Sequence, residues 1–316
     1  MKYYSYEPQL NFKPGFNIWK HNFEVFPFNI ILKYAIKITA KNTSQYVAAE
    51  DLTLTKHTYT SDNSELPFYK ISPKGKENEI LPTIIYYHGG GFICPIDIMM
   101  LNNGSFYSRN LNCHVLLPEY RLAPIFSSTT ILKDCDNFFS FVKKESSNLS
   151  VDTDNIIIYG DSAGGFLAAT TAQKLNTEKP NQLKGLVLIY PVTDDKIDIY
   201  QSMNLKYAEW NKNATKHMWR ILKKSNSDID NQYLEKRIPM NITDLPPMPP
   251  TYIEVQEYDT LKDQGIALAN KYKAAGVNCT LTKITGTYHG FDNLPGNKFV
   301  ENILTKRCEI MSSYFL

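Results

Sequence analysis

Short, continuous apolar runs alternate with segments of helical periodicity along most of this chain. Each run has the length of a strand and is bounded by polar or glycine-rich turn residues. The expected strands are residues 52–60, 66–71, 83–87, 114–118, 156–159, 186–190, 251–255 and 280–284. Helices are expected over 130–144, from near 163, over 263–274 and over 300–314. Continuous apolar strands that alternate with helices predict an α/β protein whose mostly parallel sheet is covered on both faces.

One segment interrupts this alternation. Residues 196–245 contain helical pieces, chiefly 207–222, but no strand, and a proline-rich run follows at 245–250. We interpret the segment as an inserted helical cap, with the proline run as a stiff return to the sheet. Residues 1–47 are also helical in pattern and could join the cap. The expected organisation is a single domain over 1–316, with cap elements at 1–47 and 196–245.

Composition and charge narrow the function classes. The 316 residues are 43% hydrophobic and 21% charged, which argues against wholesale disorder. The 34 Lys and Arg residues are nearly balanced by 32 Asp and Glu residues, so the formal net charge is +2. This balance lacks the strongly basic character of nucleic-acid-binding proteins, and no nucleic-acid partner is expected.

No segment has the pattern of a signal peptide or of a membrane span. The most apolar early stretch, 23–40, is interrupted by Glu24, Pro27, Lys33 and Lys37, and its apolar positions share one helical face. We expect this helix to pack on the protein body. Lying on a membrane surface is the alternative, and no stable membrane insertion is expected.

The cysteines give no sign of a metal site or of a disulfide framework. They are Cys94, Cys113, Cys135, Cys279 and Cys308. This scattered, odd-numbered set contains no CxxC pair, so reduced thiols are the expectation. Together with the missing signal peptide, it predicts a cytoplasmic location.

The clearest chemical motif is the run GDSAGG at 160–165. It stands directly after an expected strand and directly before an expected helix. G-x-S-x-G in that position is typical of a nucleophile elbow, a turn so tight that the flanking positions must be glycine. Such a turn exposes the hydroxyl of Ser162 and directs the backbone amide of Ala163 toward the same place. Ser162 is therefore the candidate nucleophile.

A second motif, HGGGF at 88–92, follows the expected strand 83–87. Its glycines permit unusual backbone conformations and expose amide groups. Near Ser162, the loop Gly89, Gly90 and Gly91 would supply oxyanion-hole donors together with Ala163. The alternative is a flexible or phosphate-binding turn, but the loop lacks the spacing of a P-loop or a dinucleotide fingerprint. We expect His88 to be structural.

A serine nucleophile requires a base and a group that orients the base. Among six histidines, only His289 lies in a loop just after a late strand. For the acid, Asp259 follows the expected strand 251–255 at its carboxyl end, where α/β sites assemble. Asp263 is better interpreted as a helix N-terminal residue, and Glu257 is a third alternative.

The motifs HGGGF, GDSAGG, EYDTLKD and YHGF, in this order and spacing, resemble the hormone-sensitive-lipase-like branch of the α/β-hydrolase superfamily. The runs YRLAP at 120–124 and YPVTD at 190–194 match further blocks of that branch, and the resemblance extends from about residue 51 to the C-terminus. It implies the α/β-hydrolase fold with a helical cap, a Ser162–Asp259–His289 triad, and an oxyanion hole made by Gly89–Gly91 and Ala163.

Four positions depart from the pattern of that branch. Ile125 and Phe126 replace the acidic residue and proline that usually follow the YRLAP block. Phe166 stands where asparagine is common, and Cys94 lies two residues past HGGGF. None belongs to the triad, and the expectation is that they alter the shape of the pocket.

The resulting function hypothesis is a serine carboxylesterase that hydrolyses small-to-medium acyl esters through an acyl-enzyme on Ser162, with no cofactor and no metal. The expected partner is a small-molecule ester, and a homodimer could form through the edge strand near the C-terminus. One alternative is a non-catalytic small-molecule receptor on the same fold, although His289 counts against it. Another is an amidase or peptidase. The aromatic residues of the insert either line the pocket or simply pack on the core.

Overall fold

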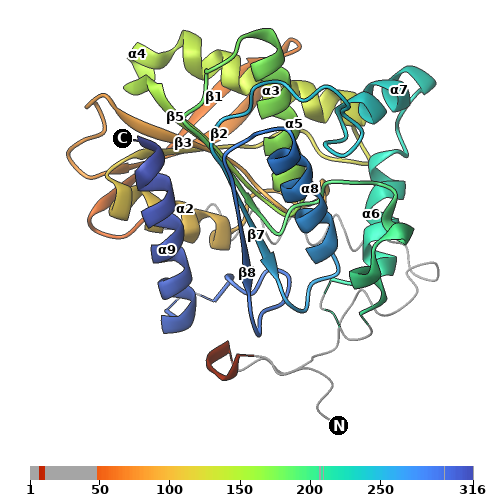
Figure 1. The fold of residues 1–316 in the computed structure, drawn as a ribbon. Helices are drawn as coiled ribbons and strands as arrows, with labels where there is room; N and C mark the ends of the chain where they lie inside the picture. Colours follow the sequence, from red (N-terminus) through yellow and green to blue (C-terminus); the bar gives the residue numbers. More distant parts are fainter. Residues whose placement is uncertain (1–6, 11–47, 206–207, 209, 295, 316) are drawn as a thin grey trace.

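Eight strands form one sheet in the computed structural model, which describes residues 7–10, 48–205, 208, 210–294 and 296–315 (Figure 1). The strands are β1 (Leu52–Ser61), β2 (Ser64–Pro73), β3 (Leu81–Tyr87), β4 (His114–Pro118), β5 (Val151–Asp161), β6 (Gly185–Ile189), β7 (Thr251–Gln256) and β8 (Cys279–Ile284). Their order is β1-β2-β4-β3-β5-β6-β7-β8. The pairs β1–β2 and β2–β4 are antiparallel and all others are parallel, so the predicted mostly parallel sheet is confirmed.

Helices cover both faces of the sheet (Figure 1). On one face lie α2 (Ile98–Leu111) and α9 (Lys298–Phe315). On the other lie α3 (Ser128–Lys144), α5 (Ala163–Glu178) and α8 (Lys262–Ala274). The strand β5 shows why both faces are needed. Its Ile156 and Ile158 pack in one apolar cluster and its Ile157 and Tyr159 in the other, because successive side chains point to opposite faces.

The order of the strands creates the crevice in which a site can form. The chain passes from β3 outward to β4 and then returns past β3 to β5, so the loops that follow β3 and β5 leave in opposite directions. In open α/β sheets, ligands bind at the carboxyl edge where this reversal occurs. HGGGF follows β3 and Ser162 follows β5, so the two motifs meet at this point.

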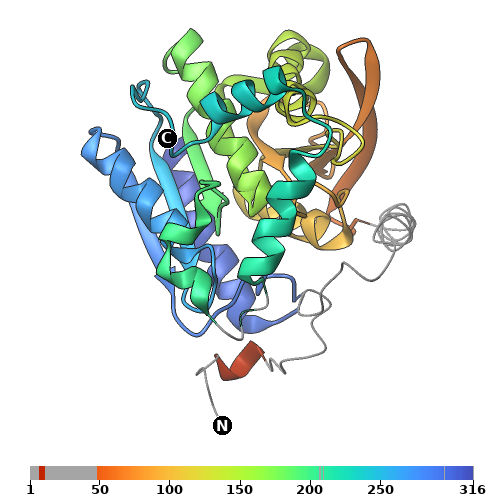
Figure 2. The same cartoon turned by 90° about the vertical axis from the view of Figure 1, so that its right-hand side faces the viewer.

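The segment between β6 and β7 contains helices and no strand among its described residues. These helices are η4 (Ile197–Ile199), η5 (Gln201–Asn204), α6 (Lys212–Leu222) and α7 (Asp228–Arg237). Figure 2 shows α6 and α7 on the side of the molecule that carries α3 and α5. The remaining elements are short: η1 (Pro8–Leu10) and α4 (Ser146–Leu149).

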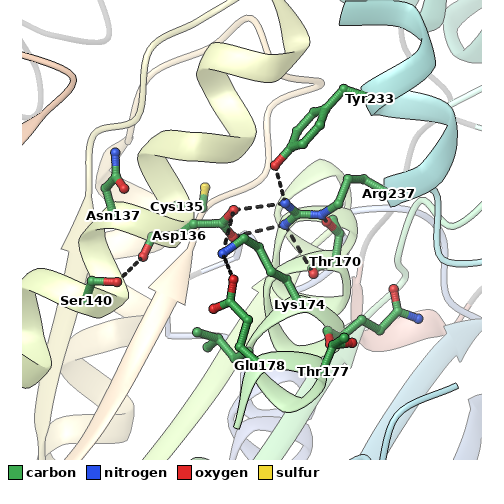
Figure 3. A network of polar contacts seen from close by, with 12 residues as sticks. Cys135, Asp136, Asn137, Ser140, Thr170, Lys174, Thr177, Glu178, Tyr233 and Arg237 are labelled. Atoms are coloured by element: carbon green, nitrogen blue, oxygen red, sulfur yellow. Dashed lines mark hydrogen bonds and ion pairs between the residues drawn. The ribbon is translucent and has the colours of Figure 1, made fainter.

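Helix α7 is tied to the body of the protein by a buried arginine (Figure 3). The guanidinium of Arg237 donates two hydrogen bonds to the carboxylate of Asp136 on α3, both over 2.9 Å. It also donates to the hydroxyl of Thr170 on α5 over 2.9 Å and to the hydroxyl of Tyr233 over 2.6 Å. Because the ion pair is bidentate and buried, removing Asp136 would leave the guanidinium without its carboxylate at a cost of about 3–5 kcal/mol. The end of the helical insert is therefore fixed to α3 and α5.

Most of the expected elements are present, with shifts of a few residues at their ends. Helix α2 was not predicted, and β5 begins at Val151 rather than at 156. The helix expected within 23–40, and most of the cap element at 1–47, lie outside the described residues. Within the described part of the chain, no helix combines the length and apolarity that crossing a bilayer requires. All five cysteines lie within the described residues and are unpaired there.

Candidate active site

Ser162 stands at the top of the turn between β5 and α5, in a backbone conformation that side chains rarely adopt. Its φ is 54° and its ψ is −119°, so it is strained as a nucleophile elbow requires. Two glycines make the turn sterically feasible. A Cβ on Gly160 would collide with the carbonyl of Gly164, and one on Gly164 would collide with the carbonyl of Tyr87. The elbow therefore presses α5 directly against β3 and β5.

The side chains of Ser162, His289 and Asp259 form an unbroken hydrogen-bonded path. Ser162 Oγ lies 2.9 Å from His289 Nε2, and His289 Nδ1 lies 2.8 Å from Asp259 Oδ2. A carboxylate only accepts, so the imidazole carries its proton on Nδ1 and leaves Nε2 to accept from the serine hydroxyl. This is the geometry in which an imidazole can remove the serine proton.

Of the three acids considered, Asp259 alone contacts the imidazole. It is fully buried, and its second oxygen accepts from the Leu261 amide over 2.9 Å, which fixes the orientation of the carboxylate. Asp263 accepts from the backbone amide of Ser202 over 2.7 Å. Glu257 accepts from the backbone amide of Gly286 over 2.9 Å. Both alternatives are thus engaged in holding loops.

The charges around His289 favour its protonated form. Burial alone would lower the pKa of His289, but nearby carboxylates, Asp259 first and then Asp161 and Asp292, raise it above the ordinary value of 6.5. An imidazole that is stabilised when protonated is suited to hold a proton transiently during acyl transfer.

Backbone amides from two loops are free to receive a negatively charged oxygen. Gly90 and Gly91 have φ of 97° and 63°, a conformation that glycine adopts without strain. Among the described residues, the amides of Gly90, Gly91 and Ala163 have no protein acceptor. A Cβ on Gly89 would collide with the Asp161 carboxylate, so this position requires glycine. Gly90 and Gly91 line the cavity beside Ser162 and Gly89 does not, which favours the first two as donors.

His88 supports this loop from within, as predicted. Its Nδ1 lies 2.9 Å from the carbonyl of Gly89, and its ring stacks on Tyr120 at 4.1 Å. The Tyr120 hydroxyl donates to the carbonyl of His88 over 2.6 Å. Burial lowers the pKa of His88 to about 4, so the ring is neutral at physiological pH.

A cavity of about 350 Å³ opens beside Ser162. Its wall includes Gly90, Gly91 and His289 together with Cys94, Trp210 and Tyr288. Burial raises the pKa of the Cys94 thiol to about 11, so the sulfur is present as a neutral, weakly polar group. The lining of the cavity combines aromatic and polar side chains.

Residues of the insert divide between the cavity and the core. The Trp210 ring lies 5.7 Å from the His289 ring and lines the cavity. Trp219 packs instead against Phe92 and against Phe166, one of the four departures from the family pattern. Of the other departures, Cys94 lines the cavity, whereas Ile125 and Phe126 are exposed and do not line it. Tyr207 lies outside the described residues.

Two residues of the site were not found by motif. Asp161 lines the cavity, and burial raises its pKa to about 7. The Tyr190 ring packs against the His289 imidazole with ring centres 4.7 Å apart. Both positions belong to motifs quoted above, GDSAGG and YPVTD, but nothing in the motifs indicates these contacts.

Over the described residues, no three His, Cys, Asp or Glu side chains are grouped closely enough to hold a metal ion.

Comparison with known proteins agrees with this architecture. A family model described as the alpha/beta hydrolase fold matches residues 84–293. The curated relatives include an arylesterase of Saccharolobus solfataricus, 28% identical over 74% of this chain and 75% of the relative. They also include an ethyl acetate hydrolase of Pseudomonas putida, 28% identical over 76% of this chain and 74% of the relative.

Solved structures share the fold. A thermophilic carboxylesterase, EstE1, cloned from a metagenomic library superimposes with a TM-score of 0.80 and is 24% identical, covering 94% of this chain and 100% of that one. At this level of identity the likeness concerns the course of the backbone. It extends the agreement beyond the residues that the family model matches.

Proposed function

This chain belongs to the alpha/beta-hydrolase family, in its hormone-sensitive-lipase-like branch, and on that premise we propose that it is a serine carboxylesterase for small-to-medium acyl esters. One observation carries the proposal: the hydrogen-bonded path from Ser162 Oγ through His289 to the buried Asp259 carboxylate. Relatives named arylesterase and ethyl acetate hydrolase support esters as the substrate class.

In the proposed reaction His289 Nε2 accepts the proton of Ser162 as Oγ attacks the ester carbonyl. The tetrahedral oxyanion is stabilised by the amides of Ala163 and the Gly90–Gly91 loop, each donor contributing about 3–4 kcal/mol in comparable enzymes. The imidazolium then protonates the departing alcohol. A water molecule, activated by the same imidazole, attacks the acyl-enzyme and releases the acid, while Asp259 keeps the imidazole in one tautomer throughout.

The insert supports the choice of small and medium esters. Trp210 narrows the cavity beside His289, and the cavity volume of about 350 Å³ suits a short acyl chain and a modest alcohol. We extend the proposal to the helical segment as a cap, with Trp210 as its pocket-facing residue. The cytoplasmic location and the homodimer stay predictions from the sequence.

The substrate class is tested with matched esters and amides. Hydrolysis of p-nitrophenyl acetate, butyrate and octanoate is expected to be fastest for acetate or butyrate, because the cavity cannot bury a long chain. The corresponding p-nitroanilides should be hydrolysed at least about a hundredfold more slowly. Faster anilide turnover would favour the amidase alternative. Inertness toward all substrates, with no labelling of Ser162 by a fluorophosphonate, would favour the receptor alternative.

The pH dependence follows from the raised pKa of His289. The base must be neutral to accept the serine proton, and a raised pKa keeps it protonated to a higher pH. Activity is therefore expected to fall on acidification with a midpoint above the ordinary histidine value of 6.5. The measurement is kcat/KM for an acetate ester between about pH 5 and pH 9, with hydrolysis recorded by pH-stat titration. A midpoint below the ordinary value would show that burial outweighs the carboxylates.

A further inference from the structure

A buried cluster of charged side chains lies behind the candidate active site. The fully buried guanidinium of Arg307, on α9, donates to both oxygens of Glu254 on β7, over 2.9 and 2.5 Å. Its third nitrogen donates to Asp292 Oδ2 over 2.6 Å and to the Tyr107 hydroxyl over 3.3 Å. The two carboxylates are 1% and 3% exposed. Such a cluster holds its geometry firmly, because breaking any pair would leave a buried charge unpaired.

One member of the cluster, Asp292, is connected to His289 in two ways, through the loop that both share and through the side chain of Tyr190. Asp292 stands three residues after His289, on the same loop following β8. Its second oxygen, Oδ1, accepts a hydrogen bond of 2.7 Å from the hydroxyl of Tyr190. The ring of Tyr190 is the one that packs against the imidazole, at 4.7 Å and an angle of 59°. The loop that carries His289 and the ring beside it are thus both attached to a single carboxylate.

We propose that Asp292, held by Arg307, is a positioning residue for His289, an inference that rests on the proposed esterase function. Its carboxylate fixes the His289 loop to α9 and fixes the Tyr190 ring against the imidazole. The His289 imidazole must keep its Nε2 between Ser162 Oγ and the leaving oxygen through two proton transfers. A displacement of about 1 Å in such a group costs on the order of a hundredfold in rate. Glu254 contributes by orienting Arg307.

The negative charge of Asp292 allows a positioning role to be distinguished from a purely structural one. The carboxylates facing His289 are Asp259 after β7, Asp161 at the end of β5 and Asp292, and Asp97 at the start of α2 lines the same cavity. The cluster holds one guanidinium against two carboxylates, so it carries an excess negative charge. Neutralising Asp292 therefore removes both an anchor and a charge. Removing the Tyr190 hydroxyl removes the anchor to the ring but leaves the charge in place.

The test compares Asp292→Asn and Tyr190→Phe with the wild type. Both variants are expected to lose about tenfold in kcat on an acetate ester with little change in KM, because the imidazole is less well held while the substrate pocket is intact. Asp292→Asn alone should also lower the pKa of His289, measured by NMR titration of the imidazole and by the acidic limb of kcat/KM. Tyr190→Phe should leave that pKa unchanged. The control Asp154→Asn removes an exposed carboxylate at the opposite end of β5 and should change neither quantity.

Two results would overturn the proposal. One is a lower melting temperature in both variants with wild-type kcat per folded molecule, which would assign the cluster to stability alone. The other is an unchanged His289 pKa in Asp292→Asn. Tyr190→Phe keeps the aromatic ring and every ion pair, so it remains folded and informative if Asp292→Asn does not fold. If the wild type hydrolyses no ester, the proposed function fails, and the NMR titration still decides whether Asp292 acts on His289.

Discussion

Ser162→Ala is expected to reduce ester hydrolysis by about 10⁴- to 10⁶-fold while leaving the fold intact. The substitution removes the oxygen that lies 2.9 Å from His289 Nε2, and so no acyl-enzyme can form. Alanine adopts the positive φ of this position no less readily than serine, and both neighbouring glycines are retained. The rate of p-nitrophenyl acetate hydrolysis and a thermal melt by circular dichroism provide the two measurements.

A matched control strengthens this experiment. Ser140→Ala removes an exposed hydroxyl on α3 that bonds only to a backbone carbonyl in its own helix, and should leave turnover at the wild-type level. The residual activity of Ser162→Ala reports what the oxyanion hole and binding contribute without a nucleophile. Turnover within tenfold of the wild type would instead place the nucleophile elsewhere and contradict the acyl-enzyme mechanism.

Asp259→Asn is expected to lower kcat by about 10⁴-fold, the second-largest effect. An amide at this position can donate to His289 Nδ1, which would stabilise the wrong tautomer and direct a proton at Ser162. It also removes the main negative charge that stabilises the imidazolium, so the pKa of His289 should fall. The measurement is kcat on an acetate ester at a pH where the wild type is fully active.

The two rejected acids serve as controls. Asp263→Asn and Glu257→Gln remove carboxylates that hold the Ser202 and Gly286 amides, and each should cost less than about tenfold in kcat. These variants share the loss of one charge with Asp259→Asn but do not contact the imidazole. If either reduced kcat as much as Asp259→Asn, the assignment of the acid would be wrong.

The central strands of the sheet were predictable because they are buried on both faces. A strand such as β4, His114–Pro118, has every residue buried and therefore reads as a continuous apolar run with sharp ends. The ends of β5 were harder to predict. After the buried Val151, residues 152–155 are polar and partly buried or exposed, and the strand pairs with β3 across a register shift. Periodicity cannot detect a strand whose beginning lies at the solvent-exposed edge.

Helix α2 was missed for a reason that lies in its composition. Its middle contains Asn102, Asn103, Gly104 and Ser105, which all have low helix propensity. Packing explains why the helix forms. Gly104 lies so close to β2 that a Cβ would be 3.0 Å from Ile71, and Asp97 caps the first turn through two backbone amides. The aspartate cap was the one signal in the sequence that could have revealed it.

In the candidate site, too, some residues could be predicted from the sequence and others could not. Ser162, His289, Asp259 and the glycine loop could be predicted as candidates because the proposed chemistry requires particular residue types at particular strand ends. Asp292 and Tyr190 could not be identified in this way. Their significance depends on a hydrogen bond between residues 102 positions apart in the sequence and on the place of α9 behind them. Neither spacing nor composition carries that information.

The Arg237 anchor has a practical consequence for redesigning substrate range. It separates the part of the insert before α7, in which Trp210 lines the cavity, from α7 itself, which is bonded to α3 and α5. To change the substrate range, the segment from Asp195 to Asn226 would therefore be replaced by the corresponding segment of another hydrolase. Residues Ser227 to Pro250 of this protein would be kept. Such a chimera would keep the Asp136–Arg237 ion pair and the cover over α3. A graft of the whole insert would remove Arg237 from Asp136 and leave Lys174, 4.0 Å away, as its cationic partner.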